Sequence, residues 1–413
     1  MCKPFHIVIK NILYYNICNM RTTARLRIGL QVENSRAHGR LLLAGIADFA
    51  LSHQDWQFDS LTPEQVKDPE VIAPYDGLIV RVMDDETSDV LSASGKPVID
   101  TYGRNGSVFN TIRLDDTAIA EMAAQFFAEH RFSTCAYCGF RGPRFSAARG
   151  AAFVSILEKA GQICQSYGGE KDAKIADTFF RNERADYVPD AKALSKWIKS
   201  LPKPIAVFCC NDVRAYQIIK ICEAEGLSVP SDVAVLGVDN DILFCTFTRP
   251  PLSSIDTNPF QLGYTAAEML GELMDSPGES AEPVIRLHSP KKIIERGTTE
   301  TFPFKVRWLS DAMVFIRRNL DRGISANDVI KHLGYSHTAV NNAFRAEIGS
   351  SVQQEIIRER IALARRLLKE TTRPAAKIAL EAGFKNPQYF SRTFASATGL
   401  TPDAWRRKNA ARR

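Results

Sequence analysis

The feature that most constrains the fold is a helix–turn–helix pattern that occurs twice near the end of the 413-residue sequence. In the first copy, residues 325–333 are typical of a short helix, and Gly334 opens a tight turn. Residues 337–347 then indicate a second helix, in which Val340 and Phe344 are spaced to face inward. This spacing predicts two short helices packed across each other.

The second copy repeats these signals in the same order. A helix expected over 375–382 is followed by a turn at Gly383 and a helix over 386–397, in which Phe390 and Phe394 form the same inward-facing pair. Glycine suits both turns, because the chain must reverse at positive φ and a small side chain lets the second helix cross the first. The repetition predicts an all-α domain with tandem helix–turn–helix units.

The same part of the chain is strongly basic. Residues 305–413 contain 21 Lys and Arg against 9 Asp and Glu, whereas the whole chain has a formal net charge of only +6. The remaining residues are therefore acidic overall. A basic module joined to an acidic one indicates nucleic-acid binding, because Lys and Arg displace counterions from phosphate. The alternative is a solvated basic surface without a partner.

Several short segments of this region carry a family resemblance. They are Ile378-Ala379, Gly383-Phe384, Tyr389-Phe390-Ser391-Arg392, Phe394, Gly399-Leu400-Thr401-Pro402 and Trp405-Arg406. With a long helix expected over 353–369, they resemble the AraC-type DNA-binding domain over residues 310–408. The resemblance implies that each second helix reads one of two successive major grooves. The first copy departs from the family at Asn342, where arginine is common, and at Ile330, where a small alanine is usual.

The candidates for DNA contact are the positions that the inward-facing pairs leave exposed on the two second helices. They are His337, Thr338, Asn341, Asn342 and Arg345 in the first copy, and Asn386, Gln388, Ser391 and Arg392 in the second. Asn can form two hydrogen bonds with adenine and Arg two with guanine, whereas Ser and Thr more often hold phosphate. Each of these residues could instead cap or solvate its helix.

Between residues 26 and 296, short apolar runs alternate with longer helical patterns, which is typical of a parallel α/β sheet. The expected strands are 27–32, 77–82, 97–100, 135–138, 205–209 and 233–238, and the expected helices include 41–52, 115–130 and 147–160. We expect two Rossmann-like lobes, with the chain crossing from one to the other around residues 105–115.

A second resemblance covers most of this α/β part. It is carried by Ala37-His38-Gly39-Arg40, Leu42-Leu43-Ala44-Gly45-Ile46, Arg149 to Phe153, Asn211-Asp212, Val229-Pro230, residues 233–241, 251–254 and 263–267, and Ile294-Glu295-Arg296. These segments resemble the LacI-like sugar-binding domain, a two-lobed periplasmic-binding-protein-like fold. In regulators of the xylose-operon type this domain precedes an AraC-type domain, and the order here is the same.

Five residues of this part are candidates for sugar contact. Asp212 and Asp239 each follow an expected strand, and ligands of open α/β sheets bind beyond the carboxyl ends of strands. Arg149, near a helix start, could join them, because carboxylates accept hydrogen bonds from sugar hydroxyls and guanidinium groups donate them. The resemblance adds Arg40, and Phe145 stands where relatives often place a tryptophan that could cover a sugar face. The alternatives are a helix N-cap for Asp212 and a turn residue for Asp239.

Cysteine usage and apolar runs indicate a reduced, cytoplasmic location. The nine cysteines are irregularly spaced and do not suggest a disulfide framework. Cys135 and Cys138 have C-x-x-C spacing, but they lie in a strand-like stretch without a second pair, so we interpret them as core residues rather than a redox or zinc site. No run of 18 apolar residues is present, and no membrane span is expected.

The expected domain boundaries follow from these patterns. Residues 1–25 form an N-terminal extension that does not resemble a signal peptide, with Met20 as an alternative start. Residues 26–300 form the sugar-binding effector domain, 301–309 a linker, and 310–408 the DNA-binding domain with helix–turn–helix units at 325–347 and 375–397.

Together the patterns predict a DNA-binding transcription regulator and not an enzyme. No Gly-x-Gly-x-x-Gly motif follows a strand, and neither a phosphate-binding loop nor a nucleophile elbow is present, so no cofactor and no metal are expected. The resemblance implies a homodimer that binds double-stranded DNA and a pentose, D-xylose, between its lobes, and that activates pentose catabolic genes with RNA polymerase. The alternatives are a regulator of a different sugar, or a solute-binding transport protein, against which the basic C-terminus argues.

Overall fold

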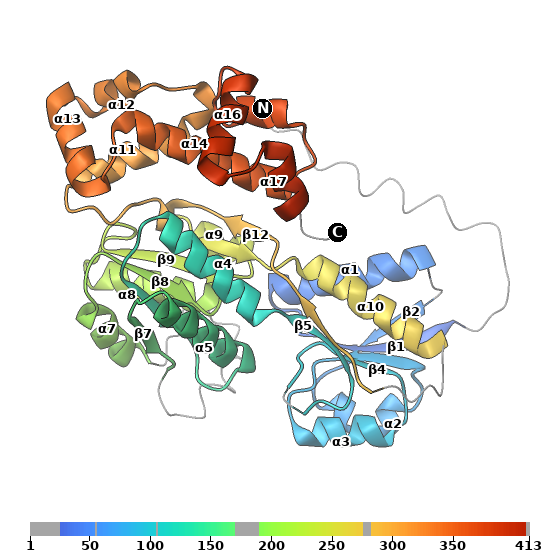
Figure 1. Cartoon of the computed structure of the whole chain (residues 1–413). Coiled ribbons are helices and arrows are strands. Elements are labelled where there is room, and N and C mark those ends of the chain that lie inside the picture. The colour runs from blue at the N-terminus through green and yellow to red at the C-terminus, as the bar shows by residue number, and fades with distance from the viewer. Residues whose placement is uncertain (1–24, 54–55, 105, 170–189, 276–281, 410–413) are drawn as a thin grey trace. The chain divides into compact units, whose positions relative to one another are not determined.

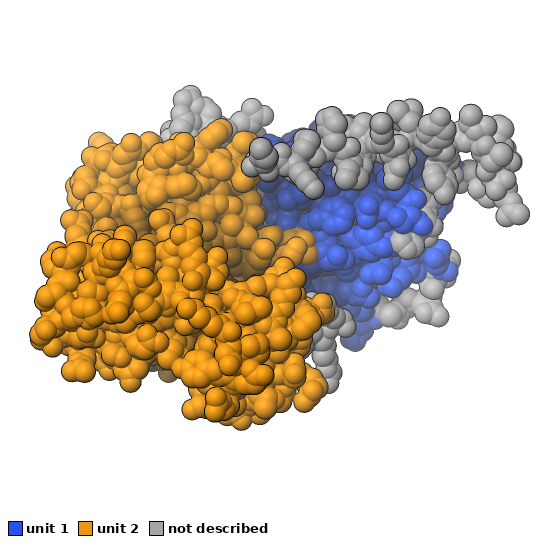
Figure 2. All heavy atoms as spheres, turned by 90° about the horizontal axis from the view of Figure 1, so that it is seen from above, with its two compact units in different colours: residues 1–113, 259–288 blue, residues 114–258, 289–413 orange. Residues whose placement is uncertain are grey.

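The computed structural model describes residues 25–53, 56–104, 106–169, 190–275 and 282–409 (Figure 1). The chain divides into two compact units, coloured separately in Figure 2. Unit 1 holds residues 1–113 and 259–288, and unit 2 holds residues 114–258 and 289–413. The first division falls within the crossing expected around residues 105–115. Met20 and the rest of the expected N-terminal extension up to residue 24 lie outside the described residues.

Unit 1 is built on a six-stranded sheet in the order β11-β5-β4-β3-β1-β2, in which β2, β1, β3, β4 and β5 are parallel. The strands are β1 (Leu26–Gln31), β2 (Trp56–Ser60), β3 (Gly77–Val80), β4 (Val98–Asp100), β5 (Asn110–Leu114) and β11 (Ile285–His288). The helices are α1 (Ala37–His53), α2 (Pro69–Ile72), α3 (Asp85–Ala93) and α10 (Pro259–Asp275), with a 3₁₀ turn at Gln65–Lys67. The buried runs of β3 and β4 suit a parallel sheet whose two faces are covered.

Unit 2 begins with a second six-stranded sheet, in the order β12-β10-β9-β8-β6-β7, in which only the edge pair β10 and β12 is antiparallel. Its strands are β6 (Cys135–Cys138), β7 (Cys164–Tyr167), β8 (Ile205–Cys209), β9 (Val233–Val238), β10 (Ser253–Asp256) and β12 (Lys292–Ile294). Its helices are α4 (Asp116–Glu129), α5 (Arg144–Lys159), α7 (Ala191–Ser200), α8 (Asp212–Ala224) and α9 (Ile242–Phe247), with a 3₁₀ turn at Gly297–Thr299.

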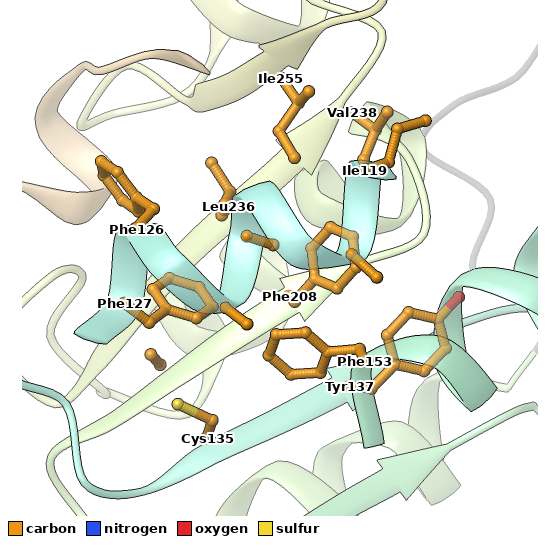
Figure 3. Close-up of a cluster of buried hydrophobic side chains, with 14 of the residues drawn as sticks. Ile119, Phe126, Phe127, Cys135, Tyr137, Phe153, Phe208, Leu236, Val238 and Ile255 are labelled. Carbon is orange, nitrogen blue, oxygen red and sulfur yellow. The ribbon is translucent and has the colours of Figure 1, made fainter. Parts of the chain in front are cut away.

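The two faces of this second sheet are covered by different helices. Alternate strand residues such as Tyr137, Phe208 and Leu236 join a cluster with α4 and α5, which Figure 3 shows from close by. Their neighbours, such as Val207 and Val235, join a second cluster with α7 and α8. Successive side chains of a strand point to opposite faces, so this double burial accounts for the continuous apolar runs in the sequence.

The remainder of unit 2 is all-α, as the repeated pattern predicted. It contains α11 (Arg307–Arg318), a 3₁₀ turn at Leu320–Arg322, α12 (Ala326–Leu333), α13 (His337–Ala343), a π-helical turn at Phe344–Ile348, α14 (Val352–Glu370), α15 (Ala375–Glu381), α16 (Pro387–Thr398) and α17 (Pro402–Asn409). The inward-facing residues of α13, of the π-helical turn after it and of α16 are fully buried: Val340, Phe344, Phe390 and Phe394.

Several sequence expectations about the elements were incomplete. Strands β2, β5, β7, β10, β11 and β12 were missed, because they are short and polar or lie at edges with exposed side chains, as in β11. The expected helix 337–347 ends at Ala343 and continues only as a π-helical turn, which Gly349 closes at φ 76°. In the segment expected as a linker, residues 301–309, Phe302 is 4% exposed within the apolar cluster of α11 to α14, and α11 begins at Arg307.

The two turn glycines provide a matched pair for a stability test. Both have positive φ, 72° at Gly334 and 82° at Gly383. A Cβ at Gly334 would meet open space, whereas a Cβ at Gly383 would lie 1.8 Å from the Leu320 carbonyl oxygen. We predict that Gly334→Ala lowers the free energy of unfolding by about 1–2 kcal/mol, the strain of a left-handed L-residue. Gly383→Ala should cost at least about 3 kcal/mol, because backbone must also move.

Denaturant unfolding of the full chain, followed by circular dichroism, measures both changes. Equal losses for the two variants would contradict the close approach of Gly383 to the Leu320 carbonyl.

Candidate functional site

The parallel strands of the second sheet run in the order β7-β6-β8-β9-β10, so the winding direction reverses between β6 and β8. Ligands of such open sheets bind beyond the carboxyl ends of the strands at this switch point. The segments that follow β6, β8 and β9 carry four of the five predicted sugar contacts: Phe145, Arg149, Asp212 and Asp239. We call these four residues the strand-end cluster.

Arg149 is the buried charge of this cluster, with only 2% of its surface exposed. Its Nε donates to Asp116 Oδ1 at 2.9 Å, and one terminal nitrogen donates to the Cys210 carbonyl at 2.5 Å. Burial acts to lower the pKa of Arg149, but the charges of Asp116 and Asp239 outweigh burial and raise it. The guanidinium therefore stays charged at the carboxyl end of β8 and lies within electrostatic reach of Asp239.

Asp212 is the first residue of α8 and lies deeper than the sequence suggested. The N-cap of α8 is Asn211, whose side chain accepts from the Arg214 amide, so the N-cap alternative for Asp212 is wrong. Asp212 is 2% exposed, and its two oxygens accept hydrogen bonds from Ser254 Oγ at 2.6 Å and from the Asp241 amide at 2.7 Å. Burial, reinforced by the charge of Asp239, raises the pKa of Asp212 well above its usual range. These contacts connect the start of α8 to the loop after β9.

Asp239 lies in that loop, at a positive φ of 103°, and is half-buried. The next residue, Asn240, also has positive φ, and its side-chain oxygen accepts a hydrogen bond from Arg296 at 2.7 Å. The turn expected at Asp239 is therefore present and is held by Arg296, from the segment after β12. Phe145 is half-buried, and the Arg149 guanidinium lies over its ring at 5.0 Å from the centroid. The ring, the guanidinium and the carboxylate belong to one end of the sheet.

Arg40 belongs to unit 1, where it lies in the first turn of α1. It is exposed, and its guanidinium donates to the carbonyls of Asn34 at 3.1 Å and Ser35 at 2.6 Å. The side chain thus closes the loop between β1 and α1. A role for Arg40 in sugar contact stays a prediction.

The sequence reasoning missed a fully buried ion pair beside the cluster. Arg214 is 0% exposed and donates to both oxygens of Asp190, at 3.0 and 2.6 Å, and to the Gly139 carbonyl at 3.1 Å. It thereby holds the loop that follows β6. Asp116, the partner of Arg149, was also missed. Each of these aspartates lies at the start of a helix, but only the tertiary fold brings it to its arginine, so the sequence carries no signal for either pair.

The C-x-x-C pair is part of the core. Cys135 and Cys138 are both buried in β6, and burial raises the pKa of each thiol to about 12. Such thiols are poor nucleophiles and poor metal ligands. Within the described ranges of the chain, no group of three or more His, Cys, Asp and Glu side chains could hold a metal ion. None of the described helices is long and apolar enough to cross a bilayer.

The predicted DNA contacts lie on α13, the π-helical turn after it, and α16. Most of them are exposed: His337, Thr338, Asn342, Arg345, Asn386, Gln388 and Arg392, with Asn341 and Ser391 half-buried. Arg392 makes no hydrogen bond or ion pair with any other described residue, so its guanidinium is available to a ligand. Two of the others already have partners. Asn341 Nδ2 donates to the His337 carbonyl at 2.9 Å, and Asn386 Oδ1 caps α16 by accepting from the Gln388 and Tyr389 amides.

A single side chain of α14 links the two helix–turn–helix units. Arg360 donates to the Ile324 carbonyl, just before the first unit, at 2.7 Å. Its guanidinium also lies 5.8 Å from the ring centroid of Phe384, in the turn of the second unit. Burial lowers the pKa of Arg360. The segment before α12 and the turn before α16 thus both contact one side chain of α14.

Comparisons with known proteins find the same two kinds of domain. A model of the periplasmic binding protein-like domain matches residues 124–299, and a model of the helix-turn-helix domain matches residues 329–408. The xylose operon regulatory protein of Haemophilus influenzae is 25% identical over 390 residues, which cover 92% of this chain and 98% of that protein. The protein of the same name in Escherichia coli K12 is 26% identical over 399 residues, covering 94% and 98%.

Two solved structures share the fold. The structure of a xylose-binding transcription activator is 24% identical, with a TM-score of 0.58, and the match covers 94% of this chain and all of that one. A LacI family transcriptional regulator from Enterococcus faecalis with bound ribose is 21% identical, with a TM-score of 0.52, over 68% of this chain and all of that one. The first match spans both parts of the chain.

These findings define the class. The chain is a DNA-binding transcription regulator in which a two-lobed, periplasmic-binding-protein-like effector domain precedes an AraC-type helix–turn–helix domain. In its order of domains and along nearly its whole length, it is similar to the xylose operon regulatory proteins.

The exposure of Arg392 generates a prediction for DNA binding. Arg392→Ala should weaken operator binding by about 1–3 kcal/mol, as expected for a good base or charged contact. The matched control is Arg322→Ala, an exposed arginine on the 3₁₀ turn Leu320–Arg322, outside both reading helices. Gel-shift titrations at fixed salt measure both affinities. If the two variants lose affinity equally, Arg392 contributes only general charge.

Proposed function

We propose that this chain is a sugar-responsive activator of pentose catabolic genes and that its effector is D-xylose. The observation that carries the proposal is similarity along 92–94% of the chain to xylose operon regulatory proteins, with both domains present in the same order. A solute-binding transport protein would share only the effector fold and has no use for the tandem helix–turn–helix domain. The proposal contains no catalytic step.

We assign direct sugar contact to the charged and aromatic side chains of the strand-end cluster other than Asp212. Arg149 would donate to sugar hydroxyls, Asp239 would accept from them, and the ring of Phe145 would cover a C–H face of the sugar. Asp212, whose two oxygens already accept hydrogen bonds, would position the Asp239 loop. Arg40, of unit 1, is a further proposed contact.

On the DNA side, we propose that a homodimer binds double-stranded DNA in the cytoplasm and acts with RNA polymerase. The contacts would come from His337, Thr338, Asn341, Asn342 and Arg345 in the first unit, and from Asn386, Gln388, Ser391 and Arg392 in the second. The net positive charge of residues 305–413 supports this assignment, because phosphate contacts dominate the affinity of such proteins.

A panel of sugars in a thermal-unfolding assay tests the effector. A ligand that binds only the folded chain stabilises it by about 2.7 kcal/mol at a concentration of 100 times its Kd. We predict a raised Tm with D-xylose and smaller shifts with other pentoses and hexoses. If no pentose or hexose raises the Tm, the sugar part of the proposal is wrong.

A matched pair of variants tests whether D-xylose raises the Tm by binding at the strand-end cluster. Asp239→Asn should remove most of the Tm shift caused by D-xylose, because the amide has lost the negative charge that faces Arg149. Asp48→Asn, at an exposed position of α1, should leave the shift unchanged.

A further inference from the structure

Helix α4 has a charged contact at each end. At its first turn, Asp116 accepts from Arg149 of the strand-end cluster at 2.9 Å. At its other end, the C-cap residue His130 is 2% exposed and faces the DNA-binding domain. Between the ends, Ile119 and Phe127 pack against the sheet in the cluster that Figure 3 shows. A helix packed in this way moves as one body, so a shift at Asp116 is carried to His130.

His130 presents one ring nitrogen to two competing partners. Its Nδ1 is 2.9 Å from the Phe126 carbonyl and therefore carries a proton that it donates there. Its Nε2 lies 2.6 Å from a terminal nitrogen of Arg317 and 2.8 Å from Glu295 Oε1. One nitrogen cannot accept from Arg317 and donate to Glu295 at once, so only one of these two contacts is a hydrogen bond at a time. The site thus has two alternative hydrogen-bonded states.

Arg317, on α11, joins this nitrogen to the DNA-binding domain. Its guanidinium donates to the Glu129 carbonyl of α4 at 3.0 Å and to Glu359 Oε2 of α14 at 2.7 Å, and it lies 4.6 Å from the ring centroid of Phe302. Arg131, which follows the C-cap residue of α4, pairs with the fully buried Glu355 of α14. Two ion pairs of α14, Arg317–Glu359 and Arg131–Glu355, therefore contact or include residues at the end of α4.

A second connection reaches the same place from the loop after β9. Arg296 donates to the side chain of Asn240, the residue after Asp239, and its neighbour Glu295 faces His130. Burial acts to raise the pKa of Glu295, but the hydrogen bond from His130 and the charges of His130, Arg317 and Arg366 lower it. The carboxylate therefore stays charged and competes with Arg317 for the imidazole.

On the far side of the contact, Glu359 is followed by Arg360, which ties the two helix–turn–helix units together. A shift of Arg317 and Glu359 is consequently a shift of the helix that sets the spacing of the two reading helices. A cavity of about 220 Å³ lies beside the contact, lined by residues that include Glu300, Thr301 and Val314. The contact is therefore not enclosed on all sides by packed side chains.

We propose that the His130–Arg317 contact, with Glu295 and Glu359 as its flanking partners, is the switch through which sugar occupancy changes DNA binding. The proposal rests on the proposed function and assigns its regulation. Arg149 and Asn240 bias the contact from the sugar side through α4 and through Arg296. Glu359 and Arg360 transmit it to the DNA side. Coupling of this kind requires an element with two discrete arrangements that both sites bias, and the imidazole of His130 provides it.

The first arm of the test needs no ligand. His130→Phe keeps a ring between Phe126 and Phe302 but removes Nε2. Hydrogen–deuterium exchange on the ligand-free full chain should show amides of α11 and of residues 126–131 exchanging about three- to tenfold faster in His130→Phe than in the wild type. Glu121→Gln, on the exposed face of α4, should exchange as the wild type does. Unchanged exchange in His130→Phe would overturn the proposal whatever the sugar is.

The second arm measures coupling. Saturating D-xylose should change the operator Kd of the wild type by a factor of about 5 to 150, as an increase or as a decrease. We call this factor the coupling ratio. In His130→Phe it should drop to less than about a third of the wild-type ratio, while the Kd for D-xylose without DNA stays within about threefold. Arg317→Lys is a second variant, for use if His130→Phe does not fold. A lysine keeps the positive charge but cannot donate to His130 and Glu359 at the same time, as arginine does, so this variant should also lose coupling.

The outcomes separate the two proposals. A wild type whose Tm no sugar raises contradicts the proposed effector, and the first arm still decides whether the contact exists. If amide exchange is faster in His130→Phe but the coupling ratio is unchanged, the contact only holds the two domains together and does not couple sugar binding to DNA binding. This result overturns the proposed switch.

Discussion

The burial of the second sheet on both faces is the constraint on which the rest of unit 2 depends. Because side chains of β6, β8 and β9 alternate between two apolar clusters, the strands are fixed in register and their carboxyl ends lie along one edge. The segments that follow these strands carry Arg149 in α5, Asp212 at the start of α8, and Asp239 in the loop after β9. The same burial anchors α4, which places Asp116 beside the strand-end cluster and His130 beside the DNA-binding domain.

Charges inside such a core must be paired, because an isolated buried charge is expensive. Arg149 is neutralised by Asp116, and Arg214 by Asp190, each with a carbonyl as an additional acceptor. In both pairs the arginine comes from a helix and holds a loop at the carboxyl edge of the sheet. The structure therefore uses buried ion pairs to position backbone at the place where a ligand is proposed to bind.

Much of this arrangement could be predicted from the sequence, for identifiable physical reasons. The tandem helix–turn–helix domain was predicted with its helices nearly in place, because glycines with positive φ and buried i, i+4 pairs such as Phe390 and Phe394 are local signals. The central strands were predicted because both faces are apolar. Short edge strands such as β11 were not, since their side chains are exposed.

The candidate site was predictable only in part. Asp239 directly follows an expected strand and Arg149 lies within an expected helix, and the sequence shows both features. The depth of Asp212, by contrast, depends on Ser254 and on the loop after β9, which are distant in the chain. Partners such as Asp116, Asp190 and Arg317 carry no local pattern that announces a long-range pair. The π-helical turn after α13 likewise interrupts a helix whose sequence pattern continues to residue 347.

The central claim is that one chain couples a sugar site to two DNA-reading helices. It is tested most directly by footprinting the full-length protein on the DNA upstream of its own and neighbouring genes, with and without D-xylose. The account predicts protection of two successive major grooves on one face of the duplex for each subunit, with an extent or midpoint concentration that changes when D-xylose is added. An identical footprint in the presence and absence of the sugar, or no protection at all, would contradict it.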